Sequence, residues 1–260
     1  MIVPIRHYGY YDHVSYANQK LSATPGQSVA GYPIGILALE LFYPLVPGNV
    51  VNPWTYDFPV RIKVVRGATI DRIFRNDPTL LDDFIQAGEE LMLDGVRALS
   101  GACGFFANYQ RELAEHFPVP VAMSSLLQVP WIKSSLKKDQ KVGIITANSA
   151  AITPYLLESV GITDGSAFVV KGIQHLEQWK PLVDMEDNGF NDTILTDQVS
   201  QAAVELCQEE NIGAILLECS DLPPYAHAIQ KAVNLPVYDY ITMMNWLYHS
   251  VCQRPYEGYF

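Results

Sequence analysis

Cys103 and Cys219 are the residues of this sequence best placed to carry chemistry, because they occupy matching positions in two similar segments. The segments read VRALSGACGFFANYQRELAEHFPVPV and IGAILLECSDLPPYAHAIQKAVNLPV, and a shift of 116 positions (219 − 103) aligns them without a gap. A proline and three apolar helix positions coincide as well: Tyr109, Leu113, Phe117 and Pro120 match Tyr225, Ile229, Val233 and Pro236. The match favours an internal duplication over a chance alignment of two βαβ units.

Each of these cysteines is predicted to lie at the carboxyl end of a strand and directly before a helix. Ligands of parallel α/β sheets bind at that edge, and a helix N-terminus favours a thiolate or a bound carboxylate. If the duplication brings the two strand ends face to face, one sulfur lies on each side of a substrate carbon. A thiolate and a thiol can then remove a proton from one face and deliver one to the other.

The remaining cysteines, Cys207 and Cys252, have no partner in the repeat. Free cysteines are most often small buried hydrophobes, which is the role that we predict for these two. No C-x-x-C pair or zinc-like spacing occurs, and the phosphate-loop, H-E-x-x-H and dinucleotide fingerprints are absent from the sequence. The predicted chemistry therefore uses no cofactor and no metal.

Two glycine-led apolar runs, GILALE from Gly35 and VGIITAN around Gly143, open the two halves of the chain. Neither run alternates polar and apolar residues, as expected for strands buried on both faces of a parallel sheet that helices cover. We predict an α/β fold of two pseudo-symmetric lobes with parallel sheets and the active site in the cleft between them. The predicted boundaries are an N-terminal arm over residues 1–34, a first lobe over 35–130 plus 241–260, and a second lobe over 131–240.

Pairs of a capping residue and a proline predict where two helices begin. Asp77-Pro78 opens a helix that runs to about Leu93, and Thr153-Pro154 opens a helix that ends at Gly161. The segment YITMMNWLYHSV near the end of the chain predicts a last helix. Residues 163–192 carry no chemical signature and are predicted to be a loop-rich excursion of the second lobe.

Polar residues near the predicted strand ends are candidates for binding a substrate. Thr146, Asn148 and Ser149 follow the strand around Gly143 and offer hydroxyl, amide and backbone N–H groups to a carboxylate, although loops use the same residues as caps. Tyr43 follows the corresponding strand of the first half and either lines the pocket or packs in the core.

The neighbours of the two cysteines are further candidates for contact with a substrate. Gly104 and Phe105 follow the first cysteine, and Ser220 and Asp221 follow the second. Asp221 precedes Leu-Pro-Pro and is either a helix cap or a group in contact with the substrate or with the neighbouring thiol.

Composition narrows the possible partners of the protein. The 260 residues include 28 acidic and 17 basic side chains, for a formal net charge of −11, so binding to nucleic acid is disfavoured. No apolar run is long enough to cross a bilayer, and the first residues lack the apolar core of a secretory signal. We therefore expect a cytoplasmic protein with no membrane partner that binds a small carboxylate through local contacts.

The residues around the two cysteines resemble the signatures of the Asp/Glu/hydantoin racemase superfamily. The resemblance rests on GACGF around Cys103 and LECSDLPPYA around Cys219, and it extends through VPVAMSSLLQVP, GIITANS and LPVYDYIT. It implies two flavodoxin-like lobes, a homodimer, and acid/base roles for both cysteines. It disfavours a decarboxylase, because the decarboxylases of the superfamily keep one of the two cysteines.

The segment FYPLVPGNVVNPWTYDFPV resembles a Pro-Gly-Asp…Asn-Pro loop of one branch of the superfamily, with Asn49 at the acidic position. That branch also resembles the algal dimethylsulfoniopropionate lyases, in which a cysteine thiolate removes an α-proton and a β-sulfonium group leaves. Gly104-Phe105 and Ser220-Asp221 replace the Asn-Thr and the Thr-Glu or Thr-His pairs that many amino-acid racemases carry. The substrate is therefore not determined by the resemblance.

Three functions follow from these observations. The leading hypothesis is a cofactor-independent racemase or epimerase that exchanges the α-proton of a small carboxylate through two cysteines. The first alternative is a lyase that uses the same proton abstraction and then a β-elimination. The second alternative is a non-catalytic protein that binds a small molecule on the same scaffold.

Overall fold

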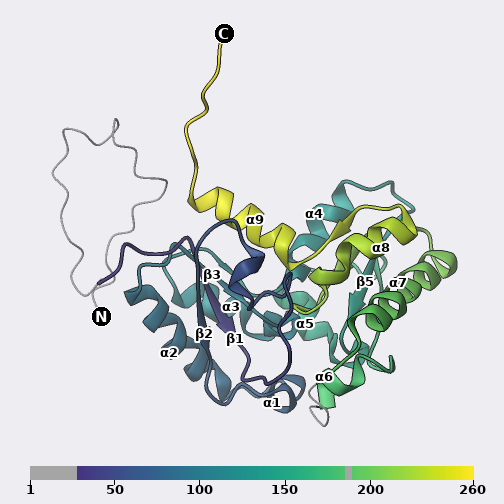
Figure 1. Cartoon of the computed structure of the whole chain (residues 1–260), viewed down its shortest axis with the longest axis horizontal. Coiled ribbons are helices and arrows are strands. Elements are labelled where there is room, and N and C mark those ends of the chain that lie inside the picture. Colours follow the sequence, from purple (N-terminus) through teal and green to yellow (C-terminus); the bar gives the residue numbers. More distant parts are fainter. Residues whose placement is uncertain (1–27, 185–188) are drawn as a thin grey trace.

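A computed structural model describes residues 28–184 and 189–260. Most of the predicted N-terminal arm, residues 1–27, lies outside the described residues. Within the described part the chain forms two four-stranded parallel sheets, one in each lobe (Figure 1). The first sheet contains β1 (Ile34–Ala38), β2 (Val60–Val64), β3 (Ala98–Gly101) and β4 (Val121–Ala122). The second contains β5 (Lys141–Thr146), β6 (Phe168–Gly172), β7 (Ile212–Leu217) and β8 (Val237–Tyr238).

The two sheets share one strand order, which is β2-β1-β3-β4 in the first lobe and β6-β5-β7-β8 in the second. The central strands are buried along their length, since every residue of β1, β3 and β7 is buried. Such strands have no solvent face and need no alternation of polar and apolar residues. The prediction of two related α/β lobes with parallel sheets is confirmed.

Helices cover the faces of both sheets (Figure 1). The first lobe carries α1 (Ile70–Phe74), α2 (Leu80–Leu93) and α3 (Gln110–His116), and α4 (Val129–Ser134) leads to the second sheet. The second lobe carries α5 (Pro154–Ser159), α6 (Lys180–Asp184), α7 (Asp192–Glu209) and α8 (Ala226–Val233). Short 3-10 helices are η1 (Pro53–Thr55), η2 (Gly104–Tyr109), η3 (Ser125–Gln128), η4 (Ser149–Ala151) and η5 (Pro223–Tyr225). None of the helices of residues 28–184 and 189–260 is long and apolar enough to cross a membrane.

The predicted helix boundaries are close to those of the structure. The Thr153 hydroxyl accepts a hydrogen bond from the backbone N–H of Leu156 at 3.2 Å, and Gly161 follows α5 with a φ of +79°, where a glycine avoids strain. The helix predicted from Asp77 begins at Leu80. The prediction for residues 163–192 is wrong in part, because β6 and α6 lie in that segment.

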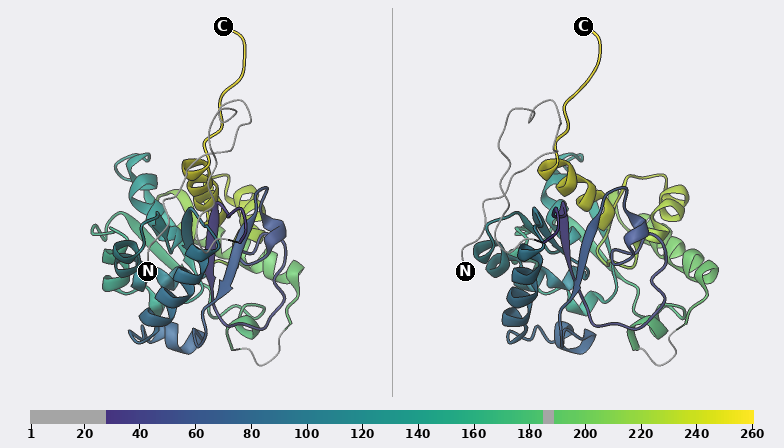
Figure 2. Two further views of the ribbon diagram at one scale, coloured as in Figure 1. Left: turned by 90° about the vertical axis from the view of Figure 1, so that its left-hand side faces the viewer. Right: turned by 60° about the vertical axis from the view of Figure 1, so that its left-hand side comes forward.

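The last helix, α9 (Tyr240–Val251), returns to the first lobe. Its buried side chains Tyr240, Met243 and Leu247 form a core cluster with Ile34 and Ile36 of β1. Asp239 caps the helix by accepting a hydrogen bond from the backbone N–H of Thr242 at 2.8 Å. In both views of Figure 2 the residues after α9 extend away from the body of the protein.

Candidate active site

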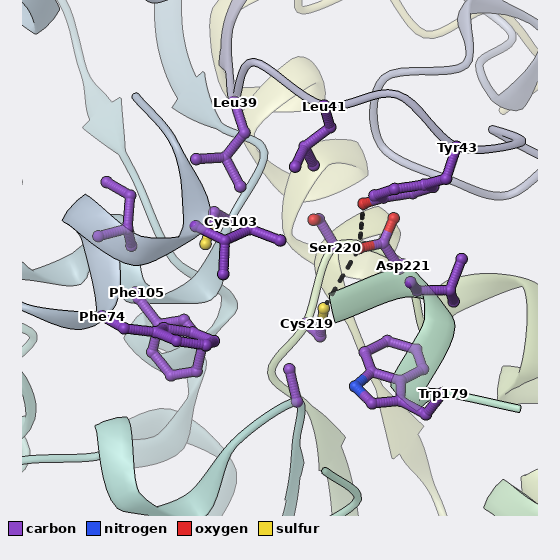
Figure 3. Close-up of a pocket in the computed structure, with 14 residues that line it drawn as sticks. Leu39, Leu41, Tyr43, Phe74, Cys103, Phe105, Trp179, Cys219, Ser220 and Asp221 are labelled. Carbon is purple, nitrogen blue, oxygen red and sulfur yellow. Dashed lines mark hydrogen bonds between the residues drawn. The ribbon is translucent and has the colours of Figure 1, made fainter. Parts of the chain in front are cut away.

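Cys103 and Cys219 line the same pocket, which lies between the two lobes (Figure 3). Cys103 follows β3 and is the N-cap residue of η2, while Cys219 follows β7 and precedes η5. Both side chains are almost fully buried, with exposed fractions of 8% and 7%. The duplication thus places one thiol of each lobe on a shared pocket, as the sequence predicts.

The rest of the pocket is mostly apolar. The residues that line it besides the two cysteines are Leu39, Leu41, Tyr43, Ile70, Ile73, Phe74, Phe105, Ala147, Trp179, Leu182, Ser220 and Asp221. Phe74 and Phe105 meet edge to face, with ring centroids 5.2 Å apart. None of these described lining residues is Lys, Arg or His, and Asp221 supplies the carboxyl group among them. The pocket therefore combines aromatic walls with a single acid.

Asp221 links the thiol of Cys219 to the first lobe. Its Oδ2 lies 3.5 Å from the Cys219 sulfur and accepts a hydrogen bond of 2.8 Å from the Tyr43 hydroxyl. Its Oδ1 accepts a hydrogen bond from the Asn49 side-chain amide, and the Asn49 oxygen in turn accepts from the backbone N–H of Val51 at 2.9 Å. Asp221 lies outside η5, whose N-cap is the next residue in the chain. Of the two predicted roles, the structure places it against the thiol and the pocket.

The pKa of both thiols lies well above the ordinary value. For Cys219 the cause is first burial and then the negative charges of Asp221 and Glu218. For Cys103 it is burial and then Glu218, while the backbone N–H groups of Phe105 and Phe106 lower the pKa less strongly. The predicted effect of a helix N-terminus is present, but desolvation outweighs it. Burial therefore favours the protonated form of both thiols, and a positive charge or a proton acceptor beside the sulfur would favour ionisation.

Glu218, which precedes the second cysteine, is a buried acid that the sequence analysis did not single out. Its side chain is fully buried; Oε2 accepts a hydrogen bond of 2.8 Å from Thr146, and Oε1 has no partner among the described residues. Burial raises the pKa of this carboxyl group from 4.5 to about 7. A signal was present in the sequence, because Glu218 is the acidic residue of the apolar run IGAILLECS.

Glu218 lies so close to the backbone of Gly104 that no larger residue fits at position 104. A Cβ at position 104 would overlap the Oε1 atom of that carboxyl group and lie 2.6 Å from its backbone oxygen. The two cysteine loops are also joined by the Ser220 hydroxyl, which donates to the backbone oxygen of Ala102 at 2.9 Å. Gly104 is thus placed between the lobes and is not among the residues that line the pocket.

The other predicted binding residues divide into two groups. Tyr43, Phe105, Ser220 and Asp221 line the pocket. Thr146, Asn148 and Ser149 do not: Thr146 bonds to Glu218, Asn148 caps η4 through the backbone N–H of Ala150, and Ser149 contacts Gln174. The side chains of these three residues therefore make hydrogen bonds within the protein and do not line the pocket.

The fold is shared with solved structures of low sequence identity. Glutamate racemase from Bacillus anthracis matches with a TM-score of 0.54 and 16% identity, over 86% of this chain and 85% of that one. Allantoin racemase from Pseudomonas fluorescens matches with a TM-score of 0.56 and 12% identity, over 87% and 99% of the two chains. The chain has the racemase fold. An unliganded arylmalonate decarboxylase has the same fold, with a TM-score of 0.52 and 12% identity over 86% and 94%, so the fold alone does not select a reaction.

Sequence similarity points to a different set of proteins. The chain is 28% identical over 232 residues to a dimethylsulfoniopropionate lyase of Durusdinium sp. clade D. This alignment covers 86% of this chain and 77% of that protein. It is 31% identical over 248 residues to dimethylsulfoniopropionate lyase 3 of Emiliania huxleyi (strain CCMP1516), covering 88% of this chain and 63% of the lyase. No protein-family model matches the chain. Both resemblances predicted from the sequence, to the racemases and to these lyases, are confirmed.

Proposed function

We propose that the protein is a cofactor-independent lyase that acts on a small carboxylate with a sulfonium group on its β-carbon, of the dimethylsulfoniopropionate class. The observation that carries the proposal is the contact between Cys219 and Asp221 in an aromatic pocket. The similarity to dimethylsulfoniopropionate lyases over 86–88% of the chain supports the same choice.

The charge of the pocket fits a sulfonium cation. Asp221 provides an attractive negative charge, and Tyr43, Phe74, Phe105 and Trp179 provide aromatic surfaces that stabilise a desolvated cation. A free amino acid such as aspartate would bring two carboxylates to a pocket whose described lining residues include no basic side chain. The pocket therefore fits the substrate of the lyase better than it fits a dicarboxylic amino acid.

The buried pair of Cys219 and Asp221 provides a route to the thiolate. Transfer of the thiol proton to Oδ2, 3.5 Å away, moves one negative charge from oxygen to sulfur. Because a cation beside a thiol favours its ionised form, binding of the sulfonium group offsets the burial that raises the thiol pKa. In this proposal Asp221 acts as the base that activates Cys219.

The elimination then balances without a further reagent. The Cys219 thiolate takes the α-proton, the electrons of that C–H bond form the double bond, and the β-carbon–sulfur bond breaks. The electron pair of that bond leaves with the sulfur as a neutral dialkyl sulfide, and the other product is acrylate. The proton that Asp221 took from the thiol passes to water, which restores the starting pair of a protonated Cys219 and an ionised Asp221.

Racemisation is the second candidate, and the position of Cys103 favours it. A second thiol on the same pocket, from the opposite lobe, can donate a proton to the α-carbon. The first step is the same as in the lyase. The two reactions differ in whether the carbanion loses a β-substituent or regains a proton.

Proton NMR in D₂O tests these alternatives. The protein is incubated with dimethylsulfoniopropionate, aspartate, glutamate and a hydantoin in separate samples. We expect dimethyl sulfide and acrylate from the first substrate, with full activity in Cys252→Ala and a greater loss in Cys219→Ala than in Cys103→Ala. Exchange of the α-proton with inversion of an amino acid or hydantoin, lost equally in both cysteine variants, would favour the racemase. No reaction with any substrate would favour a binding protein.

We also propose that the protein is a homodimer and that it acts in the cytoplasm. Analytical ultracentrifugation of the full chain measures the first, and fractionation of source cells measures the second.

A further inference from the structure

Trp179 is a buried hydrogen-bond donor in the same pocket. Its side chain is 2% exposed, and its indole Nε1 has no hydrogen-bond partner among the described residues. The turn before α6 fixes its position, because its backbone N–H donates to the oxygen of Leu176 at 3.1 Å and its own oxygen accepts from the N–H of Leu182 at 3.1 Å. In Figure 3 the nitrogen-bearing edge of the indole faces the interior of the pocket.

The other lining side chains that carry nitrogen or oxygen donors are already engaged, and so is the Cys219 thiol. The Tyr43 hydroxyl and the Cys219 thiol donate to Asp221, and the Ser220 hydroxyl donates to a backbone oxygen. An indole N–H can donate and cannot accept, and a buried donor without a partner is costly to the fold. Among the nitrogen and oxygen donors of the described lining side chains, the Trp179 N–H is left to bind a ligand.

We propose that the indole N–H of Trp179 donates a hydrogen bond to the carboxylate of the substrate. This inference rests on the proposed function, which requires a carboxylate next to the reacting carbon. Asp221 repels a carboxylate and attracts a sulfonium group, so the two ends of the substrate are held at different places. In the view of Figure 3 the sulfur of Cys219 lies between the Asp221 carboxyl group and the Trp179 nitrogen, where the carbon chain of such a substrate would pass.

The hydrogen bond strengthens as the reaction proceeds. Removal of the α-proton moves negative charge onto the carboxylate oxygens, and a fixed donor at that position stabilises the transition state more than the bound substrate. Trp179→Phe retains an aromatic ring and removes the N–H. We expect this variant to lower kcat/KM by about 10²-fold, with a loss in kcat as well as a rise in KM.

Nitrogen-15 NMR of the indole groups tests the inference without turnover. The probe is β-alanine betaine, in which a trimethylammonium group replaces dimethylsulfonium, and the control probe is trimethylpropylammonium, which lacks the carboxylate. The chain has four tryptophans, and Trp54, Trp131 and Trp246 are 91%, 62% and 69% exposed, so they serve as internal controls. The resonance that is missing in Trp179→Phe is assigned to Trp179.

We expect the betaine to move the Trp179 N–H resonance downfield and trimethylpropylammonium to leave it in place. Release of dimethyl sulfide together with binding of the betaine would support the lyase. If the Trp179 resonance then does not move, or if Trp179→Phe retains wild-type kcat/KM, the inference about Trp179 is overturned and the lyase stands. If wild-type protein neither reacts with dimethylsulfoniopropionate nor binds the betaine, the proposed function and the inference fall together.

Discussion

Replacement of Glu218 by Gln should change how the stability of the protein depends on pH. The carboxyl group is fully buried, and burial raises its pKa from 4.5 to about 7. The folded state therefore holds this proton more tightly than the unfolded state does. The resulting contribution to the free energy of unfolding is fully present below the unfolded pKa and is lost as the pH rises through about 7.

The size of the effect follows from the two pKa values of Glu218. A rise from 4.5 to about 7 corresponds to about 3 kcal/mol in total, of which about 2.5 kcal/mol is lost between about pH 5 and about pH 8.5. Glutamine cannot titrate, so the difference between wild type and Glu218→Gln should change by this amount over that interval. Any effect of burying the amide of glutamine on the free energy of unfolding is the same at every pH and does not affect the pH dependence of the difference.

Urea unfolding of both proteins across this pH range measures the difference. The exposed Glu115→Gln on α3 is the matched control and should run parallel to wild type. The Glu218→Gln variant should also lower the pKa of both thiols, because the charge of Glu218 raises the pKa of each. Activity should therefore extend to lower pH in this variant. Parallel stability curves for wild type and Glu218→Gln would refute the assignment of a buried acid with a raised pKa.

Further substitutions should separate the contributions of catalysis, charge recognition and packing. Cys219→Ala should lower kcat/KM for dimethylsulfoniopropionate by about 10²–10⁴-fold, and Cys103→Ala by less, as measured by release of dimethyl sulfide. Asp221→Asn should weaken binding of β-alanine betaine by about 10²-fold and strengthen binding of 4,4-dimethylpentanoate, in which a neutral carbon replaces the charged nitrogen, as measured by calorimetry; equal changes for both ligands would contradict a charge contact. Gly104→Ala should lower the free energy of unfolding by about 1–3 kcal/mol, whereas Gly165→Ala, with nothing within 4 Å, should not.

The sequence predicts those features that depend on local pattern and on the repeat. The sequence identifies Cys103 and Cys219 as a pair because their segments match at one offset. It also predicts α5, because Thr153 and Gly161 mark the two ends of this helix. The shared strand order of the two lobes follows from the same duplication.

The features that the sequence does not predict depend on contacts between distant segments. Trp179 reaches the pocket from a segment with no motif, and the pairing of Asn49 with Asp221 joins residues 172 positions apart. The raised pKa of Glu218 depends on its complete burial between the lobes. Residue type predicts that Thr146, Asn148 and Ser149 bind a substrate, but their hydroxyl and amide groups serve as caps and local partners.

A crystal structure with β-alanine betaine bound is the most direct test of the claim that the two thiols face one small molecule in the pocket between the lobes. We expect the Cys219 sulfur within about 4 Å of the α-carbon, the Cys103 sulfur on the other side of the same carbon chain, and the trimethylammonium group at Asp221. A betaine that contacts neither sulfur, or that binds outside the pocket shared by the two lobes, would contradict the account.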